Sequence, residues 1–162
     1  MNKNNKAANR HWNYRKLTIG IWIALAAPHI MAAPEGGQIS AGTGGISQSG
    51  DVTTVQQNSA KLAIDWQSFD VGGKETVKFA QPDAHSIALN RIQDVKPSTI
   101  DGTLTANGQV FLVNPNGVVF GKTAQVNVGG LVASTLNLSN KDFQDGNYRF
   151  NAGGKAGAVI NK

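Results

Sequence analysis

The sequence contains no cysteine and only 3 histidines. Without cysteine no disulfide can hold the fold together, so stability must come from packing and backbone hydrogen bonds. The common zinc sites need several imidazole or thiolate ligands, and after residue 33 there is one histidine, His85. We therefore predict no metal site. A serine nucleophile would have to use His85 without a Gly-x-Ser-x-Gly motif, so we favour a turn histidine beside Asp83.

Signatures of cofactor binding and acid–base catalysis are also sparse. The glycine-rich segments 34–45 and 70–75 lack the lysine pattern of a phosphate loop, so no nucleotide cofactor is expected. Paired aspartates could act as general acid and base, and a β-helical enzyme that cleaves polysaccharides stays an alternative on that ground. Each aspartate also fits a turn or strand edge, so we predict no catalytic residue and no enzyme activity. The aspartates considered are Asp65, Asp70, Asp83, Asp94 and Asp101.

The positive charge of the chain is concentrated near its N-terminus. The formal net charge is +5, yet after residue 33 basic and acidic residues are equal in number and scattered singly. Nucleic-acid binding needs a basic cluster that neutralises successive phosphates, so nucleic acid is not an expected partner. The basic residues of the first segment are Lys3, Lys6, Arg10, Arg15 and Lys16.

An apolar run, Leu17–Ala27, follows this basic segment and leads to small residues before Pro34. The run is shorter than the roughly 20 residues that a membrane-spanning helix needs, but it fits the apolar part of a secretory signal. We predict that residues 1–33 form a signal peptide with an extended basic n-region, cleaved after Ala32 or Ala33, and that the chain has no stable membrane span. An N-terminal membrane anchor is the alternative.

Short alternating patterns predict an all-β fold. Apolar and polar residues alternate in segments separated by Gly, Asn, Asp and Pro, which is typical of half-buried strands, and no amphipathic helix is expected. Aromatic residues make up only 7% of the chain, so we expect Trp66 and Phe69 in the core rather than in an exposed sugar-binding row. The alternating segments are 62–67, 86–90, 126–128 and 148–150.

A short repeat favours a solenoid among the all-β folds. The pattern Asn-Gly-x-Val-Phe occurs at 107–111 and again at 116–120. Short strands at regular spacing, each followed by a polar corner, suit coils stacked in parallel, with on the order of 20 residues or more in each coil. A β-sandwich with similar turns is the alternative.

Two continuous apolar runs, 109–113 and 118–120, flank a turn of sequence Asn-Pro-Asn-Gly. Both runs predict strands that are covered on both faces. Pro115 presets φ for the second turn position, Asn114 can accept a turn hydrogen bond through its side chain, and Asn116 tolerates a left-handed backbone. We therefore expect a corner between two buried strands.

Residues Ile64–Thr135 closely resemble the N-terminal secretion domain, or haemagglutination activity domain, of two-partner secretion (TPS) exoproteins of the filamentous haemagglutinin and high-molecular-weight adhesin type. The resemblance depends on the order and spacing of several pieces over more than half of the predicted mature chain. The family's second turn motif, Asn-Pro-Asn-Leu, does not occur. The matching pieces are Trp66 with Phe69, Val77–Pro82, Leu89–Arg91, Ser98–Gly102, Asn114–Gly117 and Gly130–Thr135.

The resemblance implies a right-handed parallel β-helix with short capping or hairpin strands, and no cofactor. It also implies export by the Sec machinery and recognition by the periplasmic POTRA domains of a dedicated outer-membrane transporter of the TpsB, or Omp85, type. The domain would leave first and seed the folding of a β-helical passenger, commonly an adhesin, a haemolysin or a contact-dependent toxin. We therefore expect a secreted or cell-surface virulence protein of a Gram-negative bacterium.

A complete domain of this family is a large all-β unit of roughly 250 residues, so we expect residues 34–162 to be its N-terminal part. A self-contained adhesin that binds host glycans or surface proteins is the alternative function. Two asparagines, Asn90 and Asn137, are expected to stack as amide ladders. The predicted recognition and folding motif is Asn114, Pro115, Asn116 and Gly117. The supporting structural residues are Trp66, Phe69, Asn90, Arg91 and Asn137.

Overall fold

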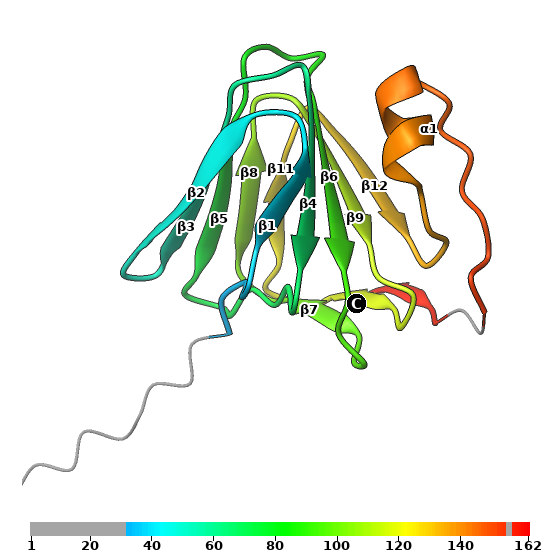
Figure 1. The fold of residues 1–162 in the computed structure, drawn as a ribbon. Helices are drawn as coiled ribbons and strands as arrows, with labels where there is room; N and C mark the ends of the chain where they lie inside the picture. Colours follow the sequence, from blue (N-terminus) through cyan, green and yellow to red (C-terminus); the bar gives the residue numbers. More distant parts are fainter. Residues whose placement is uncertain (1–31, 155–156) are drawn as a thin grey trace, which may run out of the picture.

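The computed structural model describes residues 32–154 and 157–162, so almost all of the predicted signal peptide lies outside the described residues. The described chain consists of strands and one short helix (Figure 1). The elements are β1 Gln38–Ala41, β2 Gly44–Ser49, β3 Val52–Gln57, β4 Lys61–Trp66, β5 Thr76–Ala80, β6 Ile87–Ile92, β7 Ser98–Ile100, β8 Thr103–Ala106, β9 Gln109–Val113, β10 Val118–Phe120, β11 Gln125–Asn127, β12 Gly130–Ser134, α1 Asn140–Asp145 and β13 Val159–Asn161.

The strands stack into a parallel solenoid with three faces. The strand orders are β1-β4-β6-β9-β12 on the first face, β2-β3-β5-β8-β11 on the second and β7-β10-β13 on the third. Successive coils pair in parallel, and Leu62, Ala88, Val110 and Leu131 lie in one register row. Strands β1 and β2 instead pair antiparallel with β4 and β3 and lie at one end of the stack of coils (Figure 1). The predicted parallel β-helix with added hairpin strands is therefore confirmed.

Apolar side chains from all three faces fill the interior of the solenoid. Leu62 on the first face, Leu104 on the second and Val118 on the third belong to one buried cluster. Trp66 and Phe69 are each 1% exposed, and their rings meet edge to face with centroids 5.4 Å apart. An aromatic pair of this geometry adds about 0.5–1.5 kcal/mol to the stability gained from burial. Their predicted place in the core is confirmed.

The first face is also buried on its outer side. A second apolar cluster on this side includes Ile87, Leu89 and Phe111, whereas Ala88 belongs to the inner cluster. The prediction that 109–113 is covered on both faces is confirmed, because β9 is buried from its second residue onward. The same prediction for 118–120 holds only in part, because Val119 in the middle of β10 is half-buried. Two-sided burial of β6 differs from the half-buried strand that its alternation predicts, since Ile87 and Leu89 point toward this second cluster and not into the solenoid.

The cover of the outer side is α1 with the segment that follows it (Figure 1). Ser139 caps the helix by accepting a hydrogen bond from the Asp142 N–H, and Gly146 ends it with φ 77°. Phe143, in the middle of the helix, is fully buried. No amphipathic pattern marks this helix in the sequence, because a helix of 6 residues is too short to show one. Among the described residues, no helix is long and apolar enough to cross a membrane.

The alternating segment 148–150 does not form the predicted strand. Tyr148 contacts Phe111 edge to face, with ring centroids 5.5 Å apart, and Phe150 packs against the outer cluster. The aromatic side chains alternate because they cover the first face, while the backbone makes no ladder in this segment.

Candidate functional site

The predicted corner at Asn114–Gly117 joins β9 to β10 as a hydrogen-bonded turn. The Gly117 N–H donates to the Asn114 carbonyl over 2.9 Å, and the Asn116 N–H donates to Asn114 Oδ1 over 2.9 Å. Pro115 fixes its own φ, and it lies where no strand hydrogen bond needs the backbone N–H that proline lacks. Gly117 has φ 120°, and among the described residues only glycines have positive φ. The positive-φ position is therefore Gly117, one residue after the asparagine for which the sequence allows it.

The side chain of Asn114 ties this corner to the preceding coil. It is fully buried, and its Nδ2 donates to the Lys96 carbonyl and to Ser98 Oγ, each over 3.0 Å. Both polar atoms of the amide thus have partners, with Oδ1 bound inside the turn. Buried networks of this kind are costly to break, because each lost partner leaves a desolvated polar group behind.

The side chain of Asn116 reaches the same part of the preceding coil from the solvent side. Its Nδ2 donates to the Asp94 carbonyl over 2.7 Å, although Asn116 itself is exposed. Two amides of one turn therefore hold the backbone of the loop between β6 and β7 at two carbonyls, those of Asp94 and Lys96.

Asn90 lies inside the solenoid and forms a hydrogen bond with Trp66. The indole N–H of Trp66 donates to Asn90 Oδ1 over 2.9 Å, and Asn90 Nδ2 donates to two backbone carbonyls at 3.2 and 3.3 Å. The strand register places Asn90 beside Ile64 and Leu112. The expected amide ladder at Asn90 is therefore wrong, because its neighbours on both coils are aliphatic and its amide satisfies the buried indole.

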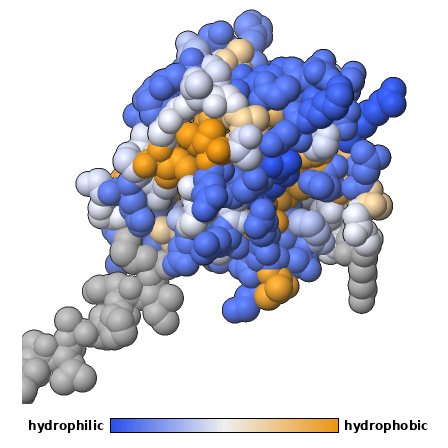
Figure 2. Space-filling view, viewed as in Figure 1, coloured by the Kyte–Doolittle hydropathy of each residue, from blue (hydrophilic) through white to orange (hydrophobic). Residues whose placement is uncertain are grey.

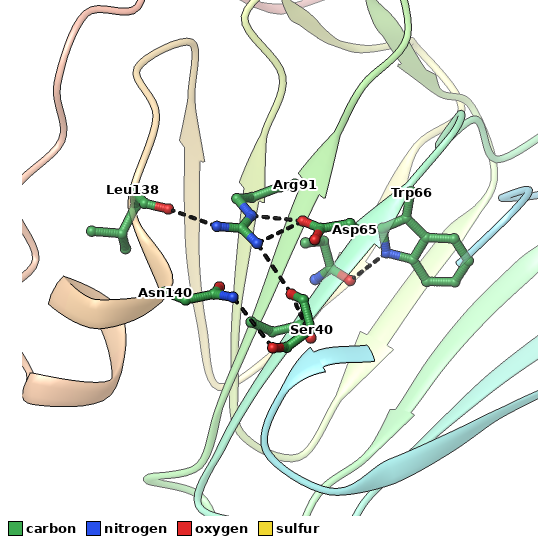
Figure 3. A network of polar contacts seen from close by, with 8 residues as sticks. Ser40, Asp65, Trp66, Arg91, Leu138 and Asn140 are labelled. Atoms are coloured by element: carbon green, nitrogen blue, oxygen red, sulfur yellow. Dashed lines mark hydrogen bonds and ion pairs between the residues drawn. The ribbon is translucent and has the colours of Figure 1, made fainter. Parts of the chain in front are cut away.

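Arg91 links three parts of the chain on the outer side of the first face (Figure 3). Its Nε donates to Asp65 Oδ1 over 2.7 Å, its Nη2 to Ser40 Oγ over 3.1 Å and its Nη1 to the Leu138 carbonyl over 3.4 Å. These partners belong to β4, β1 and the segment before α1. Arg91 therefore fastens the N-terminal strands and the α1 segment to the solenoid.

Asn137 lies beside that segment and is exposed. Its backbone exchanges two hydrogen bonds with Asn151, at 2.9 and 2.8 Å, in an isolated antiparallel bridge. This bridge joins two irregular segments and not two coils, so the ladder expected at Asn137 is wrong as well. Asn137, Arg91 and Pro115 line one surface hollow of about 470 Å³, whereas Trp66, Phe69 and Asn90 lie in the core.

Sequence reasoning missed a second corner that is rich in amides, just after β5. Gln81 is 8% exposed; its Nε2 donates to Gln57 Oε1 over 3.1 Å, and its Oε1 accepts from the Gly108 N–H over 2.8 Å. Asn107 exchanges two hydrogen bonds with the Gln81 backbone, both 2.8 Å. The repeated Asn-Gly pair was the available signal, because it marks a coil boundary at 107 as well as at 116.

Four of the five aspartates considered for acid–base catalysis act as turn and pairing residues, namely Asp65, Asp70, Asp83 and Asp94. Asp83 accepts hydrogen bonds from the Ser86 hydroxyl and the His85 N–H, each 2.9 Å, and these bonds, that of Ser86 first, hold the pKa of Asp83 below its ordinary value. Burial raises the pKa of Asp70, although the Thr99 N–H opposes the shift. No group of three or more potential metal-ligating side chains gathers within the part of the chain that the structure describes. The arrangement supplies backbone geometry and hydrogen bonds, which suit folding and recognition.

Comparisons with known proteins point to one family. A family model described as the TPS secretion domain matches residues 30–161. The crystal structure of the HMW1 secretion domain from Haemophilus influenzae is similar, with a TM-score of 0.75 and 33% sequence identity, and the match covers 80% of this chain and 35% of that chain.

Two curated relatives are heme/hemopexin-binding proteins of Haemophilus influenzae. One is 47% identical over 100 residues, which is 62% of this chain and 11% of the relative. The other, from strain ATCC 51907 / DSM 11121 / KW20 / Rd, is 45% identical over 105 residues, which is 65% of this chain and 12% of the relative. The match thus spans about a tenth of the length of these curated relatives.

Proposed function

The chain belongs to the TPS secretion domain family, and on this premise we propose that an outer-membrane transporter of the TpsB type recognises residues 34–162 during export. The transporter recognises the chain through its periplasmic POTRA domains. Residues 1–33 direct the chain through the Sec machinery of a Gram-negative bacterium, and the transporter then carries it to the medium or the cell surface.

One observation carries this proposal beyond family membership. Two side-chain amides of the turn at Asn114–Gly117 donate hydrogen bonds to the preceding coil. One of these amides belongs to an exposed residue, Asn116. A corner that needed only to turn the chain from one face of the solenoid to the next would be complete with the backbone bond from Gly117 to Asn114. The extra bonds give the surface around the corner a defined shape that a partner can recognise.

We further propose that the end of the solenoid at β11, β12 and β13 seeds the folding of further coils. These three strands lie at the edges of their sheets, and each exposes large apolar side chains, namely Val126, Leu131, Val159 and Ile160. An edge strand offers a row of free N–H and C=O groups to the next strand. Stacking a parallel coil there would satisfy those groups and bury the apolar side chains, as in other solenoids.

The activity of the passenger is a separate proposal. Two relatives are named for binding heme and hemopexin, and the matched part is a small share of their length. We infer that ligand or host-surface binding of this kind belongs to segments other than the secretion domain. A self-contained adhesin remains the alternative, and it predicts binding to host cells by the purified chain alone.

Secretion of a reporter tests the main proposal. Residues 1–162 fused to a reporter would be expressed in a Gram-negative host with and without a candidate outer-membrane transporter from the same genome. We expect the reporter in the medium only when the transporter is present. The Asn114→Ala variant should hold it in the periplasm, while Asn58→Ala, at an exposed asparagine between β3 and β4, should be secreted like the parent chain.

Periplasmic retention of the folded parent chain in the presence of its transporter would contradict the proposal. Cell binding by the purified chain would then favour the adhesin alternative. Equal secretion of Asn114→Ala and the parent chain would still support the secretion pathway, but it would contradict a role of the corner in recognition.

A further inference from the structure

The loop between β6 and β7 presents an apolar side chain at its tip. Val95 is 84% exposed, and every other exposed large apolar side chain in the described ranges is less than half exposed. The loop lies at the base of the molecule (Figure 1), where Figure 2 shows an isolated apolar patch on a largely hydrophilic surface. Asp94 and Lys96 flank Val95 with opposite charges. We call residues Asp94, Val95 and Lys96 the tip.

Several restraints fix the backbone of the tip. Inside it, Asp94 Oδ1 accepts a hydrogen bond from the Lys96 N–H over 3.1 Å, which closes a turn around Val95. Pro97 follows and fixes its own φ. From the next coil, Asn116 Nδ2 donates to the Asp94 carbonyl over 2.7 Å and Asn114 Nδ2 to the Lys96 carbonyl over 3.0 Å. The carbonyls on both sides of Val95 are thus clamped by the Asn-Pro-Asn-Gly corner.

Satisfying these carbonyls does not by itself require the Asn116 amide. Asn116 and the tip lie at the surface, where water can accept and donate in place of a side chain. What the amide adds is a fixed position for Val95. Fixing an apolar side chain in the exposed state removes the ordering cost that a flexible loop would meet on binding, which is the general gain from preorganisation.

We propose that the tip is a contact through which the periplasmic domains of the transporter recognise this chain, and that Asn114 and Asn116 are positioning residues for it. This inference rests on the proposed function. The tip fits a partner surface with an apolar depression for Val95, a basic group facing Asp94 and an acidic group facing Lys96. The opposite charges favour such a mixed protein surface, because an anionic lipid layer or a polyanion would attract one charge and repel the other.

Site-specific crosslinking locates the contact. A photoreactive amino acid would replace Val95 in residues 1–162, and in a matched variant it would replace Val52, which is 39% exposed at the start of β3. Each variant would be co-expressed with a tagged transporter and irradiated during export. We expect an adduct with the tagged transporter from position 95 and not from position 52. An adduct with a second copy of the chain, or none at position 95, would overturn the proposal.

Substitution of the tip measures its contribution to export. We expect Val95→Ser to lower the rate of transporter-dependent secretion by about tenfold, the size of a moderate contact residue, and Val52→Ser to leave it unchanged. Thermal unfolding of Val95→Ser should match the parent chain, because the side chain has few contacts to lose. Secretion of Val95→Ser at the parental rate would overturn the inference while transporter dependence of the parent chain still upheld the proposed function.

A double variant tests the positioning role of Asn116. If Asn116→Ala acts only by releasing the tip, it should slow secretion in the parent chain and have no further effect in Val95→Ser. Multiplied effects of the two substitutions would mean that Asn116 acts independently of Val95, and the positioning role would then be wrong.

Discussion

The Asn107-Gly108 and Asn116-Gly117 corners share the pattern Asn-Gly-x-Val-Phe, and each ties its asparagine side chain to the coil before it. Asn107 exchanges two hydrogen bonds of 2.8 Å with the Gln81 backbone, while Asn116 donates one of 2.7 Å to the Asp94 carbonyl. The same dipeptide therefore performs the same local task twice, which is to fasten one coil to its predecessor.

The corners differ in what the preceding coil places there. At the first corner Gln81 turns its side chain inward and joins Gln57, one coil further back, to the Gly108 N–H. At the second corner the preceding coil bulges outward and exposes Val95. The Asn-Gly repeat thus marks where one coil contacts the next. The residue of the preceding coil, Gln81 at the first corner and Val95 at the second, determines whether the corner stabilises the core or holds an exposed loop.

The two glycines differ in a parallel way. At Gly108 a Cβ would lie 2.6 Å from the Ser86 carbonyl oxygen, so only a residue without a side chain fits against the neighbouring coil. A Cβ at Gly117 would lie 2.8 Å from the Ala158 carbonyl oxygen, and Gly117 also has φ 120°, which other residues rarely adopt. The first glycine serves close packing, and the second serves the shape of the turn as well.

Replacing Gln81 should have the largest effect on stability. Gln81→Leu keeps the volume of the side chain but removes the partners of Gln57 Oε1 and of the buried Gly108 N–H. We expect the free energy of unfolding to fall by about 3 kcal/mol or more, the cost of leaving two buried polar groups without partners. Urea unfolding of the purified chain measures it.

Gln56, which precedes Gln57 in the sequence, offers a control for Gln81→Leu. Its side chain is exposed, so Gln56→Leu should change the unfolding free energy by less than about 0.5 kcal/mol. A similar loss for both variants would show that the strand end is sensitive to any change, and the contrast between the corners would fail.

Asn114→Ala should have the next largest effect on stability. Its comparison with Asn116→Ala should show that the two amides of the second corner contribute unequally. Asn114→Ala removes the partners of the Lys96 carbonyl, Ser98 Oγ and the Asn116 N–H, so we expect a loss of about 2 kcal/mol. Asn116→Ala breaks one exposed bond and should cost less than about 1 kcal/mol. Thermal unfolding of both variants checks the order, and equal losses would place Asn116 in the core network.

Much of the fold follows from the sequence because solenoid signals are local. The Asn-Gly repeat and the apolar runs at 109–113 and 118–120 predict coils whose strands are covered on both faces, and β9 has that burial. The turn bond at Asn114 follows from the chemistry of asparagine next to proline. These predictions need no information about residues one coil away.

The failures concern contacts between coils or with the cover. An amide ladder at Asn90 would need another amide beside it, but which residue lies there depends on the register, which places Ile64 and Leu112 there. Helix α1 carried a signal in Ser139 and Asp142, three residues apart as in a capping box, yet its helical character depends on burying Phe143 against β4 and β9. Val95 gave no signal, because its exposure depends on the loop that the second corner holds.

The smallest expected effect is a difference in pH dependence between two aspartates, one near each corner. Asp83 lies beside the first corner with its pKa below the ordinary value of 3.8, mainly through the Ser86 hydroxyl. Its contribution to stability is present above that value and is lost as the pH falls through its lower folded pKa. Asp83→Asn should therefore destabilise the chain at pH 7 and have little effect well below pH 3.8.

Asp70 accepts a hydrogen bond from Thr99, close to the second corner, and should behave in the opposite way. Burial raises its pKa above 3.8, Asp94 and Glu35 raise it further, and Thr99 and Lys96 oppose the shift. The folded state then favours the protonated form, so the ionised group destabilises the fold once the pH has risen through its folded pKa. Asp70→Asn should raise Tm slightly at pH 7 and lose that advantage as the pH falls to 3.8. A Tm decrease at pH 7 would mean that the carboxylate's bond to the Thr99 N–H outweighs its burial, and both corners would then depend on ionised aspartates.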